Sequence, residues 1–136
     1  MRYPIMIHKD PESDFGVTVP DLPGCNSSGK TMEDAIENAE EAILTHVEGM
    51  MMDDESIPSP TPLERLRGRV RDRSAVWAIV AVDLSKLSEK ARRINITVPE
   101  KLLSKIDSFA EKQGETRSGL LVSAALEYIA LKPFDN

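Results

Sequence analysis

Residues 91–99 read ARRINITVP, and this short stretch decides how the C-terminal part of the chain folds. Apolar side chains alternate with polar ones along it, in the two sets Ile94, Ile96 and Val98 and Arg93, Asn95 and Thr97. In an extended strand the two sets lie on opposite faces. Because a single strand with one apolar face cannot form a sheet alone, the pattern predicts a strand over residues 92–98 that pairs with a second strand.

Two amphipathic helices are predicted after this strand. Pro99 suits the first turn of a helix, where its missing N–H is not needed. Gly114 suits the left-handed position that ends this helix, and Thr116 is a natural N-cap for the next one. Gly119 does not fit this pattern, because it lies in the first turn of the second predicted helix and glycine weakens a helix by up to about 1 kcal/mol. Each helix has one apolar face, formed by Leu102, Leu103, Ile106, Phe109 and Ala110 in the first and by Leu120, Leu121, Ala124, Ala125, Tyr128 and Ile129 in the second.

The order of strand, helix, glycine turn and helix resembles the ribbon-helix-helix repressors, although an ordinary β-α-α cap has the same order. Two copies of the strand would form an antiparallel ribbon that fits the major groove of DNA. This ribbon would present Arg93, Asn95 and Thr97, whose side chains can read base edges. The resemblance implies an obligate dimer through residues 92–131, and a contact between the start of the second helix and a DNA phosphate.

The residues at the start of the second predicted helix are Thr116, Arg117 and Ser118, so the resemblance assigns the phosphate contact to them. Free backbone N–H groups and the helix dipole favour an anion at the start of a helix. The alternative for Arg117 is a solvated side chain next to a plain helix cap.

The charge of the chain divides near residue 62. Residues 1–62 contain three Lys and Arg against thirteen Asp and Glu, a net charge of −10, whereas residues 63–136 contain fourteen against ten, a net charge of +4. Such asymmetry is expected of two small domains, of which one faces a nucleic acid and the other a basic partner. A C-terminal piece of about forty residues is also near the size that needs oligomerisation to fold.

Composition excludes several classes of protein. The chain has one cysteine and so no internal disulfide framework. The first residues, MRYP, run into a strand-like pattern and do not resemble a secretory signal. No apolar stretch approaches the roughly twenty residues that span a membrane. We therefore expect a soluble, cytoplasmic protein without membrane contact.

The N-terminal half predicts a hairpin, a short strand and a helix. Residues 3–9 and 15–19 are expected as strands around a polar turn, and a third strand is expected near residues 25–28. Thr31 is a natural N-cap, with Asp34 three residues later. The helix that follows has an apolar face and an acidic face, formed by Ala35, Ile36, Ala39, Ala42, Ile43 and Val47 and by Glu33, Glu37, Glu40, Glu41 and Glu48.

Three stretches of this half carry a second resemblance. Residues 15–25 read FGVTVPDLPGC, residues 35–43 read AIENAEEAI, and residues 77–83, a fourth predicted strand, read WAIVAVD. They closely resemble the N-terminal domain of HicB-type antitoxins, and with the C-terminal tail the resemblance covers most of the chain. It implies an α+β protein with an N-terminal truncated ribonuclease-H-like β-β-β-α-β domain and a C-terminal ribbon-helix-helix domain. It also implies a partner, a HicA-type toxin ribonuclease that the N-terminal domain binds and blocks.

The predicted toxin contacts lie in the turn before the third strand and on the acidic helix face, at Asp21, Leu22, Glu33, Glu37, Glu40 and Glu41. An acidic surface suits a basic partner. The alternatives are a solvated helix face and, for the turn around Asp21, a purely structural role.

We expect no catalysis, no cofactor and no metal site. A ribonuclease-H-like nuclease holds two metal ions with clustered carboxylates, for which the candidates are Asp10, Asp14, Glu37 and Asp83. None of these lies in a recognisable catalytic motif. His8 and His46 lack ligand spacing, and Cys25 is expected to be a small buried residue.

Residues 50–73 are the least typical of the family. Met50–Met52 predict a helix end, followed by an extended, proline-rich connection over residues 56–62. Arginines at every second position from Arg65 to Arg73 suit either a basic nucleic-acid contact or a solvated linker that pairs with the acidic half. We favour the linker.

The sequence thus predicts a toxin-binding domain over residues 1–84, a linker over 85–91 and a DNA-binding domain over 92–136. The function that follows is an antitoxin that neutralises a HicA-type mRNA-cleaving toxin and represses its own operon. It would bind palindromic operator DNA as a dimer or a higher oligomer, such as a tetramer. One alternative is a stand-alone ribbon-helix-helix repressor with an N-terminal ligand-binding or assembly domain, and another is a ribonuclease-H-like nuclease.

Overall fold

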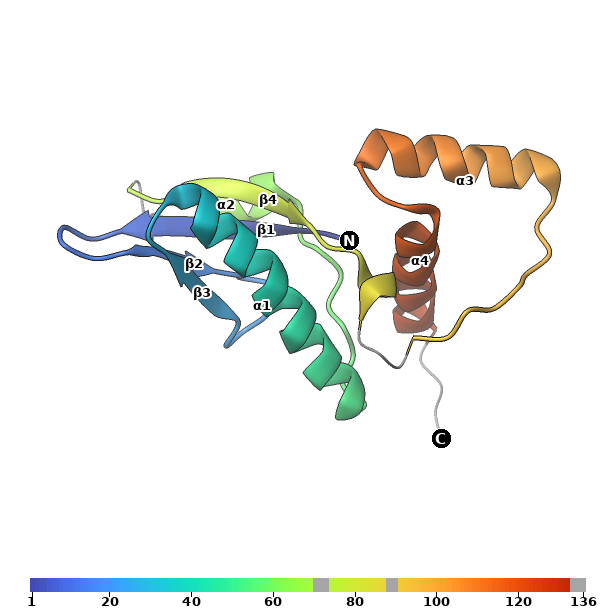
Figure 1. Cartoon of the computed structure of the whole chain (residues 1–136), viewed down its shortest axis with the longest axis horizontal. Coiled ribbons are helices and arrows are strands. Elements are labelled where there is room, and N and C mark those ends of the chain that lie inside the picture. The colour runs from blue at the N-terminus through green and yellow to red at the C-terminus, as the bar shows by residue number, and fades with distance from the viewer. Residues whose placement is uncertain (70–73, 88–90, 133–136) are drawn as a thin grey trace. The chain divides into compact units, whose positions relative to one another are not determined.

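The computed structural model describes residues 1–69, 74–87 and 91–132, and the chain forms two compact units (Figure 1). The first unit is Arg2–Val82, and the second comprises Met1 and the chain from Asp83 onward. A short 3-10 turn, η1 (Leu84–Lys86), begins the second unit where the linker was expected to start. Residues 88–90 of that linker lie outside the described part of the chain.

The first unit is built on an antiparallel sheet. Among the described residues it has four strands in the order β3-β2-β1-β4, which are β1 (Arg2–Lys9), β2 (Phe15–Thr18), β3 (Asn26–Gly29) and β4 (Val76–Ala81). The strands predicted from the sequence are therefore confirmed, with small shifts at their ends. The register pairs Ile7 with Val17 and Ile5 with Ala78. Because directly opposite residues share a face of a sheet, these apolar side chains lie on the same side.

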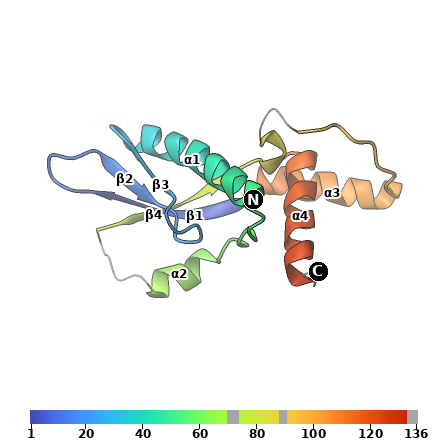
Figure 2. The ribbon, with the colours of Figure 1, turned by 90° about the horizontal axis from the view of Figure 1, so that it is seen from below.

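Helix α1 (Met32–Met52) covers one face of the sheet (Figure 2). Thr31 caps it as predicted, because the Thr31 hydroxyl accepts a hydrogen bond from the N–H of Asp34 at 3.1 Å. Ile36 and Ala42, which were predicted to be buried, lie at the edges of the apolar face and are only half-buried. The buried residues of α1 recur at three-and-four spacing and are Ala35, Ala39, Ile43 and Val47.

The chain between α1 and β4 crosses to the other side of the sheet, where helix α2 (Leu63–Arg69) lies (Figure 2). The extended segment before α2 is held in place by two side chains. Asp21 accepts hydrogen bonds from the N–H of Thr61 at 2.9 Å and from the Thr61 hydroxyl. Tyr3 donates a hydrogen bond from its hydroxyl to the carbonyl of Pro58 at 2.7 Å. These bonds keep the proline-rich connection against the sheet.

Helix α2 replaces the first part of the solvated linker that we favoured from the sequence. Leu66 is buried, and the carbonyl of Pro62 accepts the first helical hydrogen bonds, so the segment folds onto the unit. In the part of the chain that the structure describes, Arg65, Arg67 and Arg69 are exposed and form no ion pair with an acidic residue. The expected pairing with the acidic half is therefore absent there, while Arg71 and Arg73 lie outside the described residues.

The second unit contains the two predicted helices, α3 (Glu100–Gln113) and α4 (Arg117–Leu131). Gly114 ends α3 in the left-handed conformation with a φ of 68°, which confirms the predicted C-cap. Thr116 is the N-cap of α4, also as predicted. Pro99 stands one position earlier than expected, as the N-cap of α3. The turn η1 lies against α4, and its Leu84 is buried.

Much of the apolar surface of the second unit is uncovered in the single chain. Residues 91–98 form neither helix nor strand, and Ile94 and Ile96 are 78% and 59% exposed. The strand predicted there requires a second copy, so it stays a prediction. The apolar face predicted for α4 is largely unburied as well, because Ala124 and Ala125 are exposed. Further exposed apolar side chains of the two helices are Leu102, Phe109, Tyr128, Ile129 and Leu131.

Two glycine substitutions test how α1 packs on the sheet. A Cβ at Gly29 would lie 2.3 Å from the backbone nitrogen of Ala35, so Gly29→Ala must push α1 away from β3. We expect the free energy of unfolding to fall by about 1–3 kcal/mol. Urea unfolding followed by the fluorescence of Trp77, the single tryptophan, measures this for the first unit.

Gly49→Ala, in helix α1 itself, is the control substitution. A Cβ at Gly49 would meet no described atom within 4 Å, and alanine is favoured over glycine inside a helix by about 0.8–1 kcal/mol. We expect this variant to be more stable than the wild type. Equal stabilities of Gly29→Ala and the wild type would contradict the close packing of β3 on α1.

Candidate functional site

Thr116, Arg117 and Ser118 stand together at the start of α4, and all three are exposed. The Thr116 hydroxyl caps the helix by accepting a hydrogen bond from the N–H of Gly119 at 3.0 Å. The first N–H groups of a helix have no partner inside the helix, and the helix dipole adds partial positive charge there. The structure thus brings together the three residues predicted to contact a DNA phosphate, and the contact itself stays a prediction.

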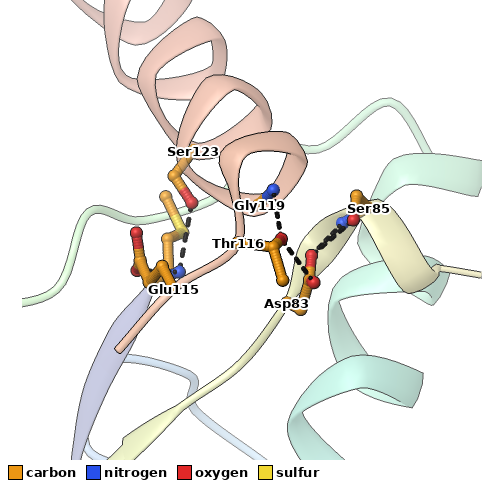
Figure 3. A network of polar contacts seen from close by, with 7 residues as sticks. Asp83, Ser85, Glu115, Thr116, Gly119 and Ser123 are labelled. Carbon is orange, nitrogen blue, oxygen red and sulfur yellow. Dashed lines mark hydrogen bonds and ion pairs between the residues drawn. The ribbon is translucent and has the colours of Figure 1, made fainter. Parts of the chain in front are cut away.

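A carboxylate of the same unit also lies at this helix start (Figure 3). Asp83 accepts hydrogen bonds from the Thr116 hydroxyl at 2.8 Å, from the N–H of Ser85 at 3.0 Å and from the Ser85 hydroxyl. Partial burial alone would raise the pKa of Asp83, but the hydrogen bonds from Ser85 and Thr116 and the charge of Lys86 outweigh burial and lower the pKa. Asp83 is therefore ionised at neutral pH, and its charge is fixed beside Thr116.

Gly119 permits this arrangement. A Cβ at position 119 would lie 2.8 Å from Oδ1 of Asp83 and 3.1 Å from the Thr116 hydroxyl oxygen. From the sequence, Gly119 is only a weak point in the first turn of α4, and Asp83 is only a candidate metal ligand. No local pattern links Asp83 to Thr116, because 33 positions separate them.

Arg117 forms a bidentate ion pair with Asp107 of α3. Its Nε donates to Oδ1 and its Nη2 to Oδ2 of Asp107, both at 2.8 Å. The hydrogen bonds and the opposite charges lower the pKa of Asp107 and raise that of Arg117. Both side chains are about half exposed, at 55% and 43%. Since exposed ion pairs are weak and exchange readily, Arg117 remains available to another anion.

A second polar cluster lies beside the first turns of α4 (Figure 3). The amino group of Met1 forms an ion pair with Glu115 at 2.9 Å and donates a hydrogen bond to the hydroxyl of Ser123 at 3.1 Å. Ser123 is buried and its hydroxyl has little access to water, so the Met1 amino group supplies a hydrogen-bond partner. The cluster ties Met1 to the residue that precedes the N-cap.

The predicted base-reading residues Arg93, Asn95 and Thr97 lie in the extended segment before α3, and all three are exposed. Their side chains are available in the single chain, as direct readout of bases requires. Whether they share one face of a ribbon depends on the pairing of two copies, so this assignment stays a prediction.

The acidic residues predicted to contact a toxin share the exposed side of α1, at Glu33, Glu37, Glu40 and Glu41. Leu22 differs, because it is 0% exposed and belongs to the core of the first unit. Asp21 is half-buried, and its carboxylate is engaged by Thr61. Of the six residues predicted to contact a toxin, only the four α1 glutamates are exposed, while Leu22 and Asp21 hold the turn in place, and the contact itself stays a prediction.

A shallow groove of about 560 Å³ runs between β3 and α1 in the first unit. Asn38 crosses it, because its side-chain amide donates a hydrogen bond to the carbonyl of Ser28 at 2.9 Å. Cys25 also lines the groove. Burial raises the pKa of its thiol, so this thiol is protonated at neutral pH. The groove is lined by Gly24, Cys25, Asn26, Ser27, Ser28, Asn38, Glu41, Ala42, Thr45 and His46. Glu41 therefore belongs both to the acidic face and to the groove.

The carboxylates considered for nuclease chemistry come from different elements of the chain. Asp10 and Asp14 lie in the turn between β1 and β2, Glu37 lies on α1, and Asp83 belongs to the second unit. Within the described ranges, no three histidine, cysteine or acidic side chains gather as a metal site. Among these residues, no helix combines the length and apolar character that crossing a membrane requires.

A double-mutant cycle tests the approach of Asp83 to Gly119. In an ordinary helix Gly119→Ala would stabilise by up to about 1 kcal/mol, but here the new Cβ would crowd Asp83. We expect Gly119→Ala to stabilise α4 in an Asp83→Ala background and not in the wild type. Hydrogen exchange of the α4 amides measures the local stability. A coupling energy of about 0.5 kcal/mol or more supports the contact, and additive effects contradict it.

Comparisons with known proteins cover most of the chain. Residues 3–125 match the family described as HicB_like antitoxin of bacterial toxin-antitoxin system. An uncharacterized 14.9 kDa protein of the rep–hol intergenic region of Haemophilus phage HP1 is 43% identical over 118 residues, which are 87% of this chain and 88% of the phage protein.

Solved structures agree in fold. The crystal structure of the Burkholderia pseudomallei antitoxin HicB matches with a TM-score of 0.73 and 46% identity, over 95% of this chain and 98% of that chain. A chain of the HicA3 and HicB3 toxin–antitoxin complex matches with a TM-score of 0.53 and 35% identity, over 61% of this chain and 99% of that chain. The family match and these likenesses together show that this chain belongs to the HicB-like antitoxins of bacterial toxin–antitoxin systems.

Proposed function

We propose that the first unit binds and neutralises a HicA-type mRNA-cleaving toxin, and that the second unit represses the chain's own operon by binding palindromic operator DNA. The observation that carries the proposal is the contrast between the two units. The first exposes an acidic helix face beside a groove. The second exposes an extended segment that carries Arg93, Asn95 and Thr97, together with uncovered apolar side chains.

Neutralisation requires only that the antitoxin cover the working surface of the toxin. A ribonuclease that binds RNA needs a basic surface, and the glutamates of α1 complement such a surface. Their exposure leaves them free to steer a basic partner towards the first unit. The HicA3 and HicB3 complex supports a partner of this class, because one of its chains resembles this one.

Operator binding requires a second copy of the chain. Exposed Ile94 and Ile96 become buried if residues 92–98 of two copies pair as an antiparallel ribbon. The exposed residues Leu102, Phe109, Tyr128 and Ile129 would complete the shared core. The opposite face of the ribbon then presents Arg93, Asn95 and Thr97 twice, once in each half of a palindrome. Sedimentation of the full chain should therefore give a dimer or a higher oligomer.

A stand-alone repressor remains a second candidate, favoured by the groove between β3 and α1. A groove of about 560 Å³ is large enough for a small ligand, and its lining is rich in hydroxyl and amide groups. Co-purification of the chain with the product of the adjacent reading frame decides between the two. A stable complex supports the antitoxin, and its absence supports the lone repressor.

Charge reversal on α1 tests the toxin-binding surface. We expect Glu37→Lys to weaken binding to a HicA-type toxin by about fivefold or more, because a favourable charge contact becomes a repulsive one. Most of the loss should appear in the association rate, and added salt should reduce it. Surface plasmon resonance at two salt concentrations measures both.

Glu64→Lys is the matched control, because Glu64 is an equally exposed glutamate on α2, on the other side of the sheet (Figure 2). It should change the association rate by less than about twofold, the scale of an isolated surface charge. Equal losses in both variants would show that net charge, and not the α1 surface, determines toxin binding.

The DNA-binding roles predict two different patterns of loss. Arg93→Ala, Asn95→Ala and Thr97→Ala should each weaken operator binding, by about 1–3 kcal/mol where a bidentate base contact is lost. Arg117→Ala should instead weaken binding to operator and random DNA alike, since phosphates carry no sequence information. It should also flatten the slope of log affinity against log salt by roughly 0.9 for each lost contact, twice over in a dimer.

Fluorescence anisotropy with an operator duplex and a random duplex of the same length distinguishes the two patterns. Toxin binding by the same variants is the control for folding of the first unit. An unchanged salt slope for Arg117→Ala would leave Arg117 as a partner of Asp107 alone. A loss on random DNA equal to that on operator would remove a residue of the strand from base reading.

A further inference from the structure

We propose that Asp83 limits the affinity of the second unit for DNA, because its carboxylate occupies the start of α4 where a backbone phosphate would bind. The inference rests on the proposed DNA-binding role of Thr116, Arg117 and Ser118, and it adds a residue that opposes this role. The evidence for it is the hydrogen-bond network formed by Asp83, Ser85, Thr116 and Gly119 (Figure 3).

The Thr116 hydroxyl has one hydrogen, and Asp83 takes it. The hydroxyl donates to Oδ2 of Asp83 at 2.8 Å while it accepts from the N–H of Gly119 at 3.0 Å. A threonine hydroxyl has one donor and two acceptor lone pairs. While the bond to Asp83 persists, Thr116 can offer a phosphate only a lone pair, which an anion does not accept. A phosphate must therefore displace Asp83 before it can receive this hydrogen bond.

The negative charge of Asp83 also opposes the binding of a phosphate. Oδ1 lies so close to the helix that a Cβ on Gly119 would be 2.8 Å away. A phosphate on the first N–H groups of α4 would therefore lie well within the screening length of this carboxylate, which is about 8 Å at physiological salt. The two anions compete for one helix dipole. Since the hydrogen bonds from Ser85 and Thr116 favour the charged form of Asp83, neutralisation at neutral pH does not relieve the repulsion.

Asp107 is a weaker competitor than Asp83. Its ion pair with Arg117 is about half exposed on both sides, so water and salt screen it. Asp83 is partly buried and is held by two groups of Ser85 besides Thr116. A phosphate can take Arg117 from Asp107 by a change of side-chain rotamer. The two hydrogen bonds from Ser85 to Oδ1, in contrast, keep the Asp83 carboxylate beside Thr116 even when the bond from Thr116 to Oδ2 breaks. Asp83 is thus the residue that determines how strongly the helix start holds DNA.

The consequence concerns affinity for all DNA. A phosphate contact adds equally to operator and random DNA, so a residue that opposes this contact weakens both. The contacts of Arg93, Asn95 and Thr97 with bases are untouched by Asp83. An antitoxin held less tightly by random DNA has a larger free fraction that can meet the toxin.

The experiment compares Asp83→Asn with the wild type as full-length proteins. The probes are the duplex upstream of the chain's own reading frame and a random duplex of equal length, each titrated at several salt concentrations. We expect the Kd of Asp83→Asn to be lower on both duplexes by about three- to thirtyfold, the scale of a helix-dipole contact in each of two half-sites. The salt slope should steepen by roughly 0.9 per gained contact.

Glu127→Gln is the matched control. It removes the same single charge from an exposed residue of α4, about 15 Å along the helix from Arg117 at 1.5 Å per residue. Its Kd should change by less than about twofold, because that distance exceeds the screening length. If Asp83→Asn loses helical signal in circular dichroism, Asp83→Ser replaces it, since serine keeps a capping oxygen for the N–H of Ser85.

Three results would overturn the inference: an unchanged Kd and slope in folded Asp83→Asn, weaker binding by that variant, or an equal gain in Glu127→Gln. If Arg117→Ala weakens binding while Asp83→Asn has no effect, the phosphate role stands and only the role of Asp83 fails. If the wild type binds neither duplex, the proposed DNA function fails and this inference fails with it.

Discussion

Strand β1 organises the first unit, because it pairs with β2 on one side and β4 on the other. Its alternate residues Tyr3, Ile5 and Ile7 are almost completely buried. A slip of one residue in its register would turn these side chains to the opposite face, so the register is strongly specified. The sheet in turn supports α1, whose buried alanines allow close packing and whose opposite face is acidic. The acidic face and the groove beside β3 thus owe their position to the pairing of β1.

The second unit meets a different constraint. Its helices are well capped, by Gly114 at the end of α3 and by Thr116 at the start of α4. The ends of both helices are therefore stabilised, but apolar side chains such as Phe109 and Tyr128 remain more than half exposed. A unit this small cannot enclose its own apolar surface, and burial against a second copy is the usual solution. The proposed dimer thus follows from an unfinished core as much as from the family of the chain.

The start of α4 combines stability and function in one place. Thr116 satisfies the N–H of Gly119 and fixes Asp83, while the same helix end is the proposed phosphate contact. A charged carboxylate stabilises the start of a helix for the reason that a phosphate binds there, namely the free N–H groups and the helix dipole. The proposed role of Asp83 is a consequence of this shared physics.

The sequence alone determined the local structure and the family of this protein. Strand-like runs bounded by turn residues predicted the strands of the first unit, three-and-four periodicity predicted α1, α3 and α4, and Thr31, Gly114 and Thr116 marked helix ends, because these signals act over a few neighbouring residues. The strand predicted by alternation over residues 92–98 stays a prediction. The motifs FGVTVPDLPGC and AIENAEEAI pointed to the HicB-like antitoxins, in agreement with the family match. Helix α2 was missed, because its seven residues contain few apolar positions to show a period.

Only the tertiary structure decided which of these residues are available and what they touch. It buried Leu22, engaged Asp21 with Thr61, and paired Arg117 with Asp107. It also placed Asp83 beside Thr116 across 33 positions and showed why position 119 is glycine. Contacts of this kind depend on how distant segments pack. The contact between Asp83 and the start of α4 joins residues far apart in the sequence, so no local pattern of residues indicates it.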